Sequence, residues 1–325
     1  FLVGGVHDGI RQMFRVVEHA RMMIGTKSAA TMSTGYLNAL AYATERVQGA
    51  DLTEASDKSA PRVPIIRHPD VRRMLMEQKA TAEGLRALVS YAAAAQGLAE
   101  TAPDNLSLAA RCDLLLPLVK GYASEKAYEV LARSLQVLGG SGYTEDYPLE
   151  QYIRDSKVDT VYEGTTGIQA LDLFFRKIAR DQGTAVQELL TEMRAFAKGG
   201  PDDELTPDRD LLGGMLDDLE VQLGAMVDHL MASLGGDTDR IYSVGLHTNA
   251  LLASMSEAVI SWQLLRHAEV ALAALPTATA DASFYRGKLA AARWFVRHSA
   301  PQVTARRADA EAEDGSLMLL EDAAF

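Results

Sequence analysis

One carboxylate in this sequence lies on a glycine-containing turn directly before a predicted helix. It is Glu163, in residues 161–169, where Gly164 permits a sharp turn and Thr166 and Gln169 have the spacing of a capping box. Free N–H groups and the helix dipole at such a helix start stabilise a negative charge or an incoming oxyanion, and Glu163 lies beside them. From spacing alone, an acid that merely complements the dipole is the simpler interpretation.

Two other predicted helix ends carry residues that can contact a ligand. Residues 136–143 contain Gly139, Gly140 and Gly142, which allow close approach of the backbone to a ligand or form a helix C-cap and turn. They are not a dinucleotide fingerprint, because the third glycine has the wrong offset and no strand precedes them. In residues 45–49, Arg46 can grip a phosphate or simply complement the dipole at a helix end.

Composition excludes several classes of protein. The net charge of −12 argues against binding of nucleic acid, which needs clustered cations. The one cysteine, Cys112, has apolar neighbours and is expected to be a buried, inert thiol in a reducing cytoplasm. The seven histidines lack metal-ligand spacing, so no metal site is expected. No apolar run reaches the roughly 20 residues of a membrane helix, so no membrane insertion is expected.

The elements that position these residues are predicted to be helices almost throughout, because period-two strand patterns are nearly absent. A predicted helix begins at Asp70, directly after Pro69, and runs to about Leu98. Asn105 caps the next helix, and Gly139 ends it. Long antiparallel helices of this kind form an up-and-down bundle. Three more amphipathic helices follow the Gly/Pro/Asp-rich segment 199–203, and residues 316–325 are expected to dock as a strap.

Taken together and in order, five segments resemble the C-terminal helical half of an acyl-CoA dehydrogenase. They are residues 17–21, 45–49, 136–143, 152–156 and 162–165. The resemblance implies an all-α fold, with a four-helix bundle in residues 1–183 and an additional helical domain in residues 184–325 of the type found in longer bacterial members. This family's N-terminal helical domain and middle β-domain have no counterpart in the sequence, so we expect a fragment of a longer enzyme that starts before Phe1.

The resemblance also implies roles for individual residues. Glu163 would be the general base that takes the α-proton of an acyl-CoA thioester, while a hydride leaves the β-carbon for FAD and trans-2-enoyl-CoA forms. Residues matching FAD contacts are Arg46, Gln48, Gln136, Gly139, Gly140 and Thr165, with Arg46 and Gln48 often reaching the FAD of a neighbouring subunit. Residues matching the substrate site are Arg21, Glu18, Tyr162 and Gly164.

The family further implies electron-transferring flavoprotein as the acceptor, a homodimer or homotetramer, and the bacterial cytoplasm as the compartment. Two alternatives remain open at this point. An acyl-CoA oxidase performs the same chemistry, and a non-catalytic helical assembly module or incomplete half-enzyme would retain the motifs without turnover.

Overall fold

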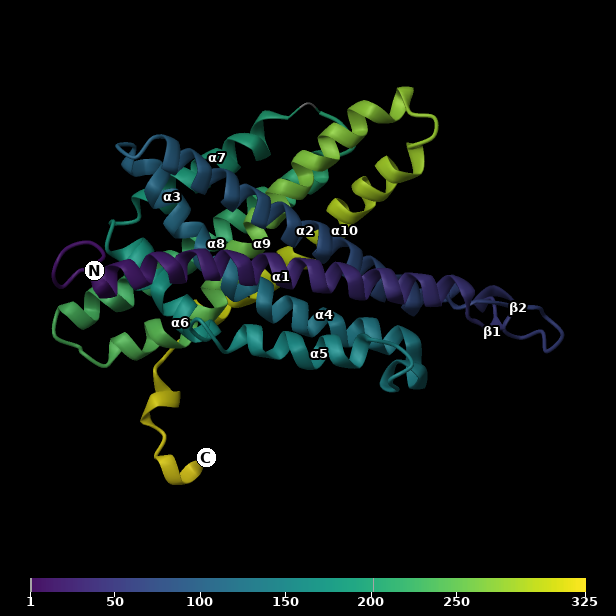
Figure 1. Ribbon diagram of the computed structural model, residues 1–325, viewed down its shortest axis with the longest axis horizontal. Coiled ribbons are helices and arrows are strands. Elements are labelled where there is room, and N and C mark those ends of the chain that lie inside the picture. The colour runs from purple at the N-terminus through teal and green to yellow at the C-terminus, as the bar shows by residue number, and fades with distance from the viewer. Residues whose placement is uncertain (1, 201) are drawn as a thin grey trace.

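The first half of the chain forms long helices that run back and forth along one axis (Figure 1). The computed structural model describes residues 2–200 and 202–325, so Phe1 and Pro201 lie outside the described residues. The helices are α1 (Gly9–Glu45), α2 (Pro69–Thr101), α3 (Leu106–Pro117), α4 (Ala123–Leu138) and α5 (Leu149–Lys157). α1 packs on α2 and α4, and α4 packs on α5. The predicted all-α fold is confirmed.

Proline, asparagine and glycine set the ends of these helices. Pro69 is the first residue of α2, one residue before the predicted start at Asp70, because its missing N–H costs no intrahelical hydrogen bond there. Asn105 is the N-cap of α3, and its side chain accepts a hydrogen bond from the backbone N–H of Leu108 at 3.2 Å. Gly139, with a φ of 59°, ends α4 in a conformation that costs glycine little.

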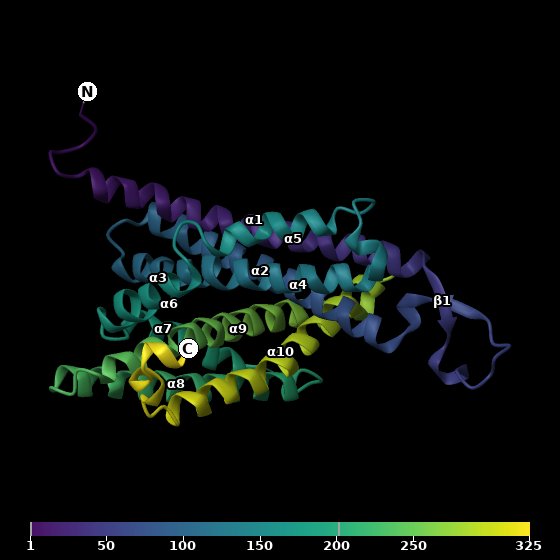
Figure 2. The same ribbon diagram turned by 90° about the horizontal axis from the view of Figure 1, so that it is seen from below.

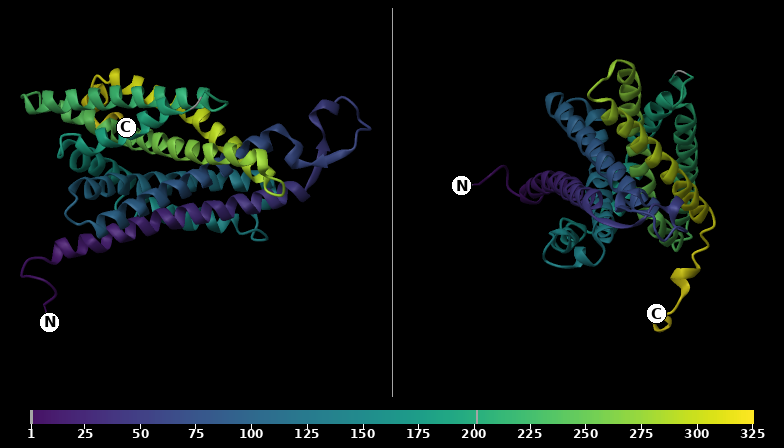
Figure 3. Two further views of the ribbon diagram at one scale, coloured as in Figure 1. Left: turned by 90° about the horizontal axis from the view of Figure 1, so that it is seen from above. Right: turned by 90° about the vertical axis from the view of Figure 1, so that its right-hand side faces the viewer.

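Two local features were not predicted. Strands β1 (Val47–Ala50) and β2 (Arg62–Pro64) pair in an antiparallel hairpin that projects past the end of the helices (Figure 3). The strands are too short to show a period-two pattern. In addition, α3 continues into α4 through a π-helical turn, Leu118–Tyr122. Such turns inside helices are frequently associated with functional sites.

The second half adds α7 (Thr184–Gly199), α8 (Thr206–Leu234), α9 (Arg240–Ala274) and α10 (Ala282–Glu311). The last three are the predicted amphipathic helices, whereas α7 was missed. Figure 2 shows α8, α9 and α10 on the side of the molecule opposite α1 and α5, with α2 and α4 between them.

One hydrophobic core joins the two halves. Buried side chains of α2 and the π-helical turn, such as Leu88 and Leu118, belong to the same cluster as Met255 and Trp262 of α9. The division of the chain into residues 1–183 and 184–325 therefore stays a prediction. Among the described residues, no helix combines the length and the apolar character needed to cross a membrane.

The C-terminal tail does not dock as a strap. Residues 316–325 extend away from the helices (Figures 1 and 3), and Leu319 and Phe325 are 81% and 86% exposed. Residues 317–320 are four consecutive apolar residues, and all of them are exposed. The prediction of a docked strap is therefore wrong.

Candidate active site

Glu163 lies on a strained turn between the short helical turn Val158–Thr160 and α6 (Thr166–Leu171). Its φ is 57°, in the left-handed region that non-glycine residues rarely adopt, and Gly164 follows with a φ of 94°. Two consecutive residues of this kind persist only when the surroundings hold them. The Glu163 side chain is half-buried, and no hydrogen bond or ion pair to its carboxylate occurs within residues 2–200 and 202–325. The turn thus presents an unpaired carboxylate at a helix N-terminus.

Three side chains from different helices hold the carbonyl groups of this turn. The Glu163 carbonyl accepts hydrogen bonds from Arg21 Nε at 3.3 Å and Gln169 Nε2 at 3.1 Å. The Gly164 carbonyl accepts one from Lys120 Nζ at 2.6 Å and a longer one from Gln169 Nε2 at 3.4 Å. The structure thus brings together Arg21 of α1 and the predicted residues Glu163 and Gly164, and adds Lys120, which the sequence analysis did not single out.

The charges around the turn are largely buried. The pKa of Lys120 is lowered to about 8, chiefly by burial. The carboxylate of Glu125 opposes this shift, Arg21 adds to it, and Asp159 and Glu163 also oppose it. Asp159 is itself 1% exposed and pairs with Lys27 Nζ at 2.8 Å. Arg21 also lies 3.6 Å from Asp172 of the π-helical segment Asp172–Ala179. Burial, followed by the charge of Asp159, raises the pKa of Tyr162, which is 41% exposed beside Glu163.

The predicted capping box at Thr166 and Gln169 is wrong. The N-cap of α6 is Thr165, whose side chain makes no capping hydrogen bond. The Thr166 hydroxyl instead donates to Glu125 Oε1 of α4 at 2.6 Å. The Gln169 amide donates instead to the Glu163 and Gly164 carbonyls of the preceding turn. Both side chains therefore fasten the Glu163 turn rather than cap the helix.

The residues predicted to bind FAD lie at two ends of the molecule. Thr165 is exposed and lies two residues after Glu163. The other five are exposed at the opposite end, namely Arg46, Gln48, Gln136, Gly139 and Gly140. From Arg21 to Arg46, α1 rises roughly 37 Å at about 1.5 Å per residue. The Tyr42 hydroxyl, which donates to Ser141 Oγ at 3.4 Å, joins the end of α1 to the glycine turn after α4.

Arg46 and Gln48 already contact each other. Arg46 is the residue directly after α1, and its Nη2 donates to Gln48 Oε1 of β1 at 3.4 Å. The five residues at this end of the molecule offer one guanidinium, two amides and exposed glycine backbone. No atom lies within 4 Å of a Cβ built on Gly139 or Gly140. These groups suit a phosphate-bearing cofactor by charge and hydrogen bonding.

Glu18 lies in a separate hollow of about 610 Å³ between the start of α1, the end of α2 and α3. Its carboxylate pairs with Arg15 at 3.3 Å, one turn earlier on α1. Cys112 lines the same hollow and is only half-buried, so the prediction of a buried thiol is wrong. The burial that it has still raises the pKa of the thiol. No interaction described for the structure joins Glu18 to Glu163, so its role at the substrate stays a prediction.

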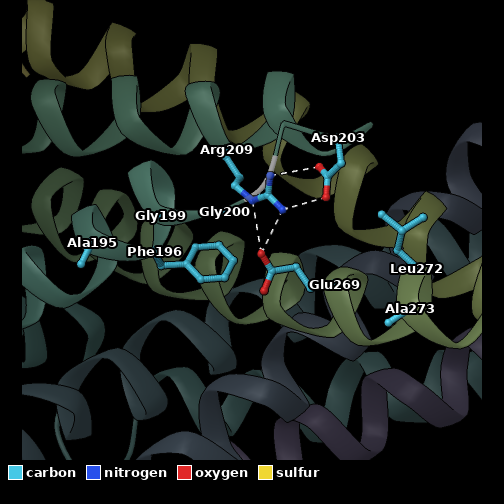
Figure 4. A pocket seen from close by; sticks show the side chains of 9 residues that line it. All are labelled: Ala195, Phe196, Gly199, Gly200, Asp203, Arg209, Glu269, Leu272 and Ala273. Atoms are coloured by element: carbon cyan, nitrogen blue, oxygen red, sulfur yellow. Dashed lines mark hydrogen bonds and ion pairs between the residues drawn. The ribbon is translucent and has the colours of Figure 1, made fainter.

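A further hollow of about 600 Å³ lies among α7, α8 and α9 in the second half (Figure 4). Phe196 and Leu272 contribute apolar walls, and the Arg209 guanidinium lies between two carboxylates. Arg209 binds Asp203 and Glu269, each at 3.0 Å, and is 3% exposed. Because both acids neutralise it, Arg209 ties the segment before α8 to α9 rather than presenting a free cation.

The fold and the sequence define the family of this chain. Residues 7–178 match the family model described as "Acyl-CoA dehydrogenase, C-terminal domain", and residues 189–321 match "Acetyl-CoA dehydrogenase C-terminal like". The chain belongs to the acyl-CoA dehydrogenase family, as the sequence motifs indicated.

Two curated relatives illustrate the similarity. The chain is 51% identical to the broad-specificity linear acyl-CoA dehydrogenase FadE5 of Mycobacterium tuberculosis, covering 100% of this chain and 54% of the relative. It is 33% identical to 3-methylmercaptopropionyl-CoA dehydrogenase of Ruegeria pomeroyi, over 91% of this chain and 49% of that protein. The chain thus spans about half the length of these relatives.

Solved structures share the fold. Caenorhabditis elegans ACDH-11, determined with C11-CoA, superposes with a TM-score of 0.73 at 20% identity, over 91% of this chain and 45% of that one. An acyl-CoA dehydrogenase of Bacillus anthracis complexed with FAD gives 0.71 at 17% identity, over 97% and 53%. Both agree with the helical arrangement described above.

Proposed function

We propose that this chain carries the catalytic base of an enzyme that dehydrogenates acyl-CoA thioesters between the α- and β-carbons. The observation that carries the proposal is the unpaired Glu163 carboxylate on a strained turn at a helix N-terminus, in a chain of this family. A structural acid that only complemented the dipole would not require a left-handed backbone, which costs roughly 1–3 kcal/mol.

The residues of the chain would act as follows. Glu163 takes the α-proton, while the free N–H groups at the start of α6 favour negative charge that develops on the thioester oxygen. FAD, when bound, supplies the acceptor for the hydride that leaves the β-carbon. Arg21, Lys120 and Gln169 hold the backbone of the turn, so the base does not need to be reoriented for each turnover.

The split cofactor residues support a shared flavin site. Thr165 would contact a flavin next to Glu163, and Gln136, Gly139 and Gly140 would lie along the adenosine diphosphate. All five residues at that end, Arg46 and Gln48 included, would reach the FAD of a neighbouring subunit, because the length of α1 separates them from Glu163 of the same chain. The proposal therefore includes a homodimer or homotetramer, with electron-transferring flavoprotein as the acceptor and the bacterial cytoplasm as the compartment.

The test is turnover of octanoyl-CoA by the full-length gene product that contains this chain, with ferrocenium as the acceptor. Glu163→Gln is nearly isosteric, so we expect the fold and bound flavin to persist while kcat falls by at least about a thousandfold, the upper range for lost acid–base chemistry. Glu220→Gln, on α8 and paired only with Arg194 in the described structure, is the matched control and should keep its activity.

Near-normal turnover by Glu163→Gln would contradict the assignment of the base. A wild-type protein without flavin and without turnover would favour the alternative of an assembly module.

A further inference from the structure

A fully buried lysine holds the turn that carries Glu163. Lys120 is 0% exposed, and its ammonium donates to the Gly164 carbonyl at 2.6 Å. No ion pair to Lys120 occurs among the described residues. Lysine is almost never buried without a paired carboxylate, and a helical core is usually as stable or more stable with an apolar side chain in such a place. Packing alone therefore does not explain this residue.

Removal of the Lys120 ammonium would leave the Gly164 carbonyl poorly satisfied. The remaining donor to that carbonyl in the described structure is Gln169 Nε2 at 3.4 Å, and the same amide is closer to the Glu163 carbonyl at 3.1 Å. The two residues of the turn have φ values of 57° and 94°, so the backbone tends to relax once a restraint is lost. Lys120 is thus the main restraint on the second peptide of the turn.

The C-terminal helices fix Lys120 from the other side. Tyr122, two residues further along the π-helical turn, is buried and donates to Glu257 Oε1 of α9 at 3.2 Å. The Arg306 guanidinium of α10 donates hydrogen bonds to both carboxylate oxygens of Glu257, at 2.7 and 3.2 Å. Gly121 lies between Lys120 and Tyr122, and a Cβ built on it would lie 2.9 Å from Leu252 of α9. The π-helical turn and α9 are therefore in close contact.

We propose that Lys120 is a positioning residue for the base, and that α9 and α10 set its place through Tyr122, Glu257 and Arg306. The additional C-terminal helices then contribute to the reaction without touching substrate. This inference rests on the proposed function. It assigns a role to the second half of the chain, whose helices supply none of the predicted site residues.

The charge of Lys120 gives the proposal a pH signature. Burial lowers the pKa of Lys120 to about 8, so the ammonium loses its proton, and the stronger charge-assisted hydrogen bond, above that pH. The charged groups that act on it are Arg21 of α1, Glu125 of α4, Asp159 of the short turn Val158–Thr160, and Glu163 itself. We expect kcat to decrease on the alkaline side with an apparent pKa near 8.

The test compares Lys120→Met with wild type in the full-length gene product, measuring kcat and KM for octanoyl-CoA across this pH range. Loss of a hydrogen bond from a charged group predicts a decrease in kcat of about tenfold or more, a small change in KM, and no alkaline decrease near pH 8. The control is Lys288→Met, which breaks a partly buried pair with Glu83 far from the turn and should leave both profiles unchanged. Wild-type kcat together with a wild-type alkaline decrease in Lys120→Met would overturn the proposal.

A second readout does not depend on turnover or on a drastic substitution. Tyr122→Phe removes one hydroxyl and should accelerate backbone hydrogen exchange in residues 158–171, as Lys120→Met should, whereas Lys288→Met should not. Unchanged exchange in Tyr122→Phe would overturn the role given to α9 and α10. If wild type fails to oxidise acyl-CoA although exchange changes as expected, the proposed function fails, while the restraint that Lys120 and the C-terminal helices place on the turn is still demonstrated.

Discussion

Replacing Gly164 by alanine should destabilise the protein, whereas the same change three residues later should not. Gly164 has a φ of 94°, where an L-residue costs roughly 1–2 kcal/mol. The new Cβ would also lie 2.9 Å from Gln169 Nε2, which would have to move away from the Glu163 carbonyl, at a cost of about 1 kcal/mol. Lower entropy of the unfolded chain offsets about 0.5 kcal/mol. The net loss in the free energy of unfolding is about 2 kcal/mol.

Gly167 is the matched control for this prediction. No atom lies within 4 Å of a Cβ built there, and Gly167 is helical in α6. Gly167→Ala should therefore leave stability unchanged or raise it by up to about 1 kcal/mol. Urea unfolding followed by circular dichroism gives both values. A Gly164→Ala protein within about 0.5 kcal/mol of wild type, or an equal loss in both variants, would refute the strain argument.

Three further predictions concern other parts of the structure. Because Lys120 has a lowered pKa, the folded protein loses its proton above pH 8 while the unfolded chain keeps it to about pH 10. Between about pH 8 and pH 10, the free energy of unfolding of wild type should therefore rise relative to that of Lys120→Met by about 1.4 kcal/mol per pH unit. If urea unfolding shows a difference between the two proteins that does not change with pH, the burial argument is contradicted. Since burial raises the pKa of Cys112, its thiol should react with Ellman's reagent much more slowly in the native than in the unfolded protein, and equal rates would show that it is accessible. Arg46→Ala should weaken FAD retention by about tenfold without changing the unfolding transition, and unchanged retention on gel filtration would remove Arg46 from the flavin site.

Several helix boundaries were readable from the sequence because local chemistry fixes them. Pro69, Asn105 and Gly139 act through their own backbone or a neighbouring N–H, so their effect needs no knowledge of the fold. The helix α7 was overlooked although Val186, Leu189, Leu190 and Met193 have helical spacing and are buried. The hydrophobic spacing typical of a helix is therefore present in the sequence of α7.

The supporting residues of the site could not be read in the same way. Lys120 lies in an otherwise apolar stretch, and a lone cation among Leu118, Val119 and Tyr122 was the one available signal. Its partner Gly164 is distant in the sequence, and the contact exists only because the π-helical turn Leu118–Tyr122 and the turn before α6 meet in the bundle. Likewise, the capping-box pattern failed because Gln169 found better acceptors in a strained turn that local propensity does not predict.

Anaerobic mixing of the flavin-loaded, full-length gene product with one equivalent of octanoyl-CoA tests the role of Glu163 most directly. In wild type, the visible flavin absorbance should bleach as the acyl-CoA is oxidised. In Glu163→Gln, the flavin band should remain, with substrate bound but the α-proton in place. Bleaching of the variant at a rate close to wild type would contradict the assignment of Glu163 as the base.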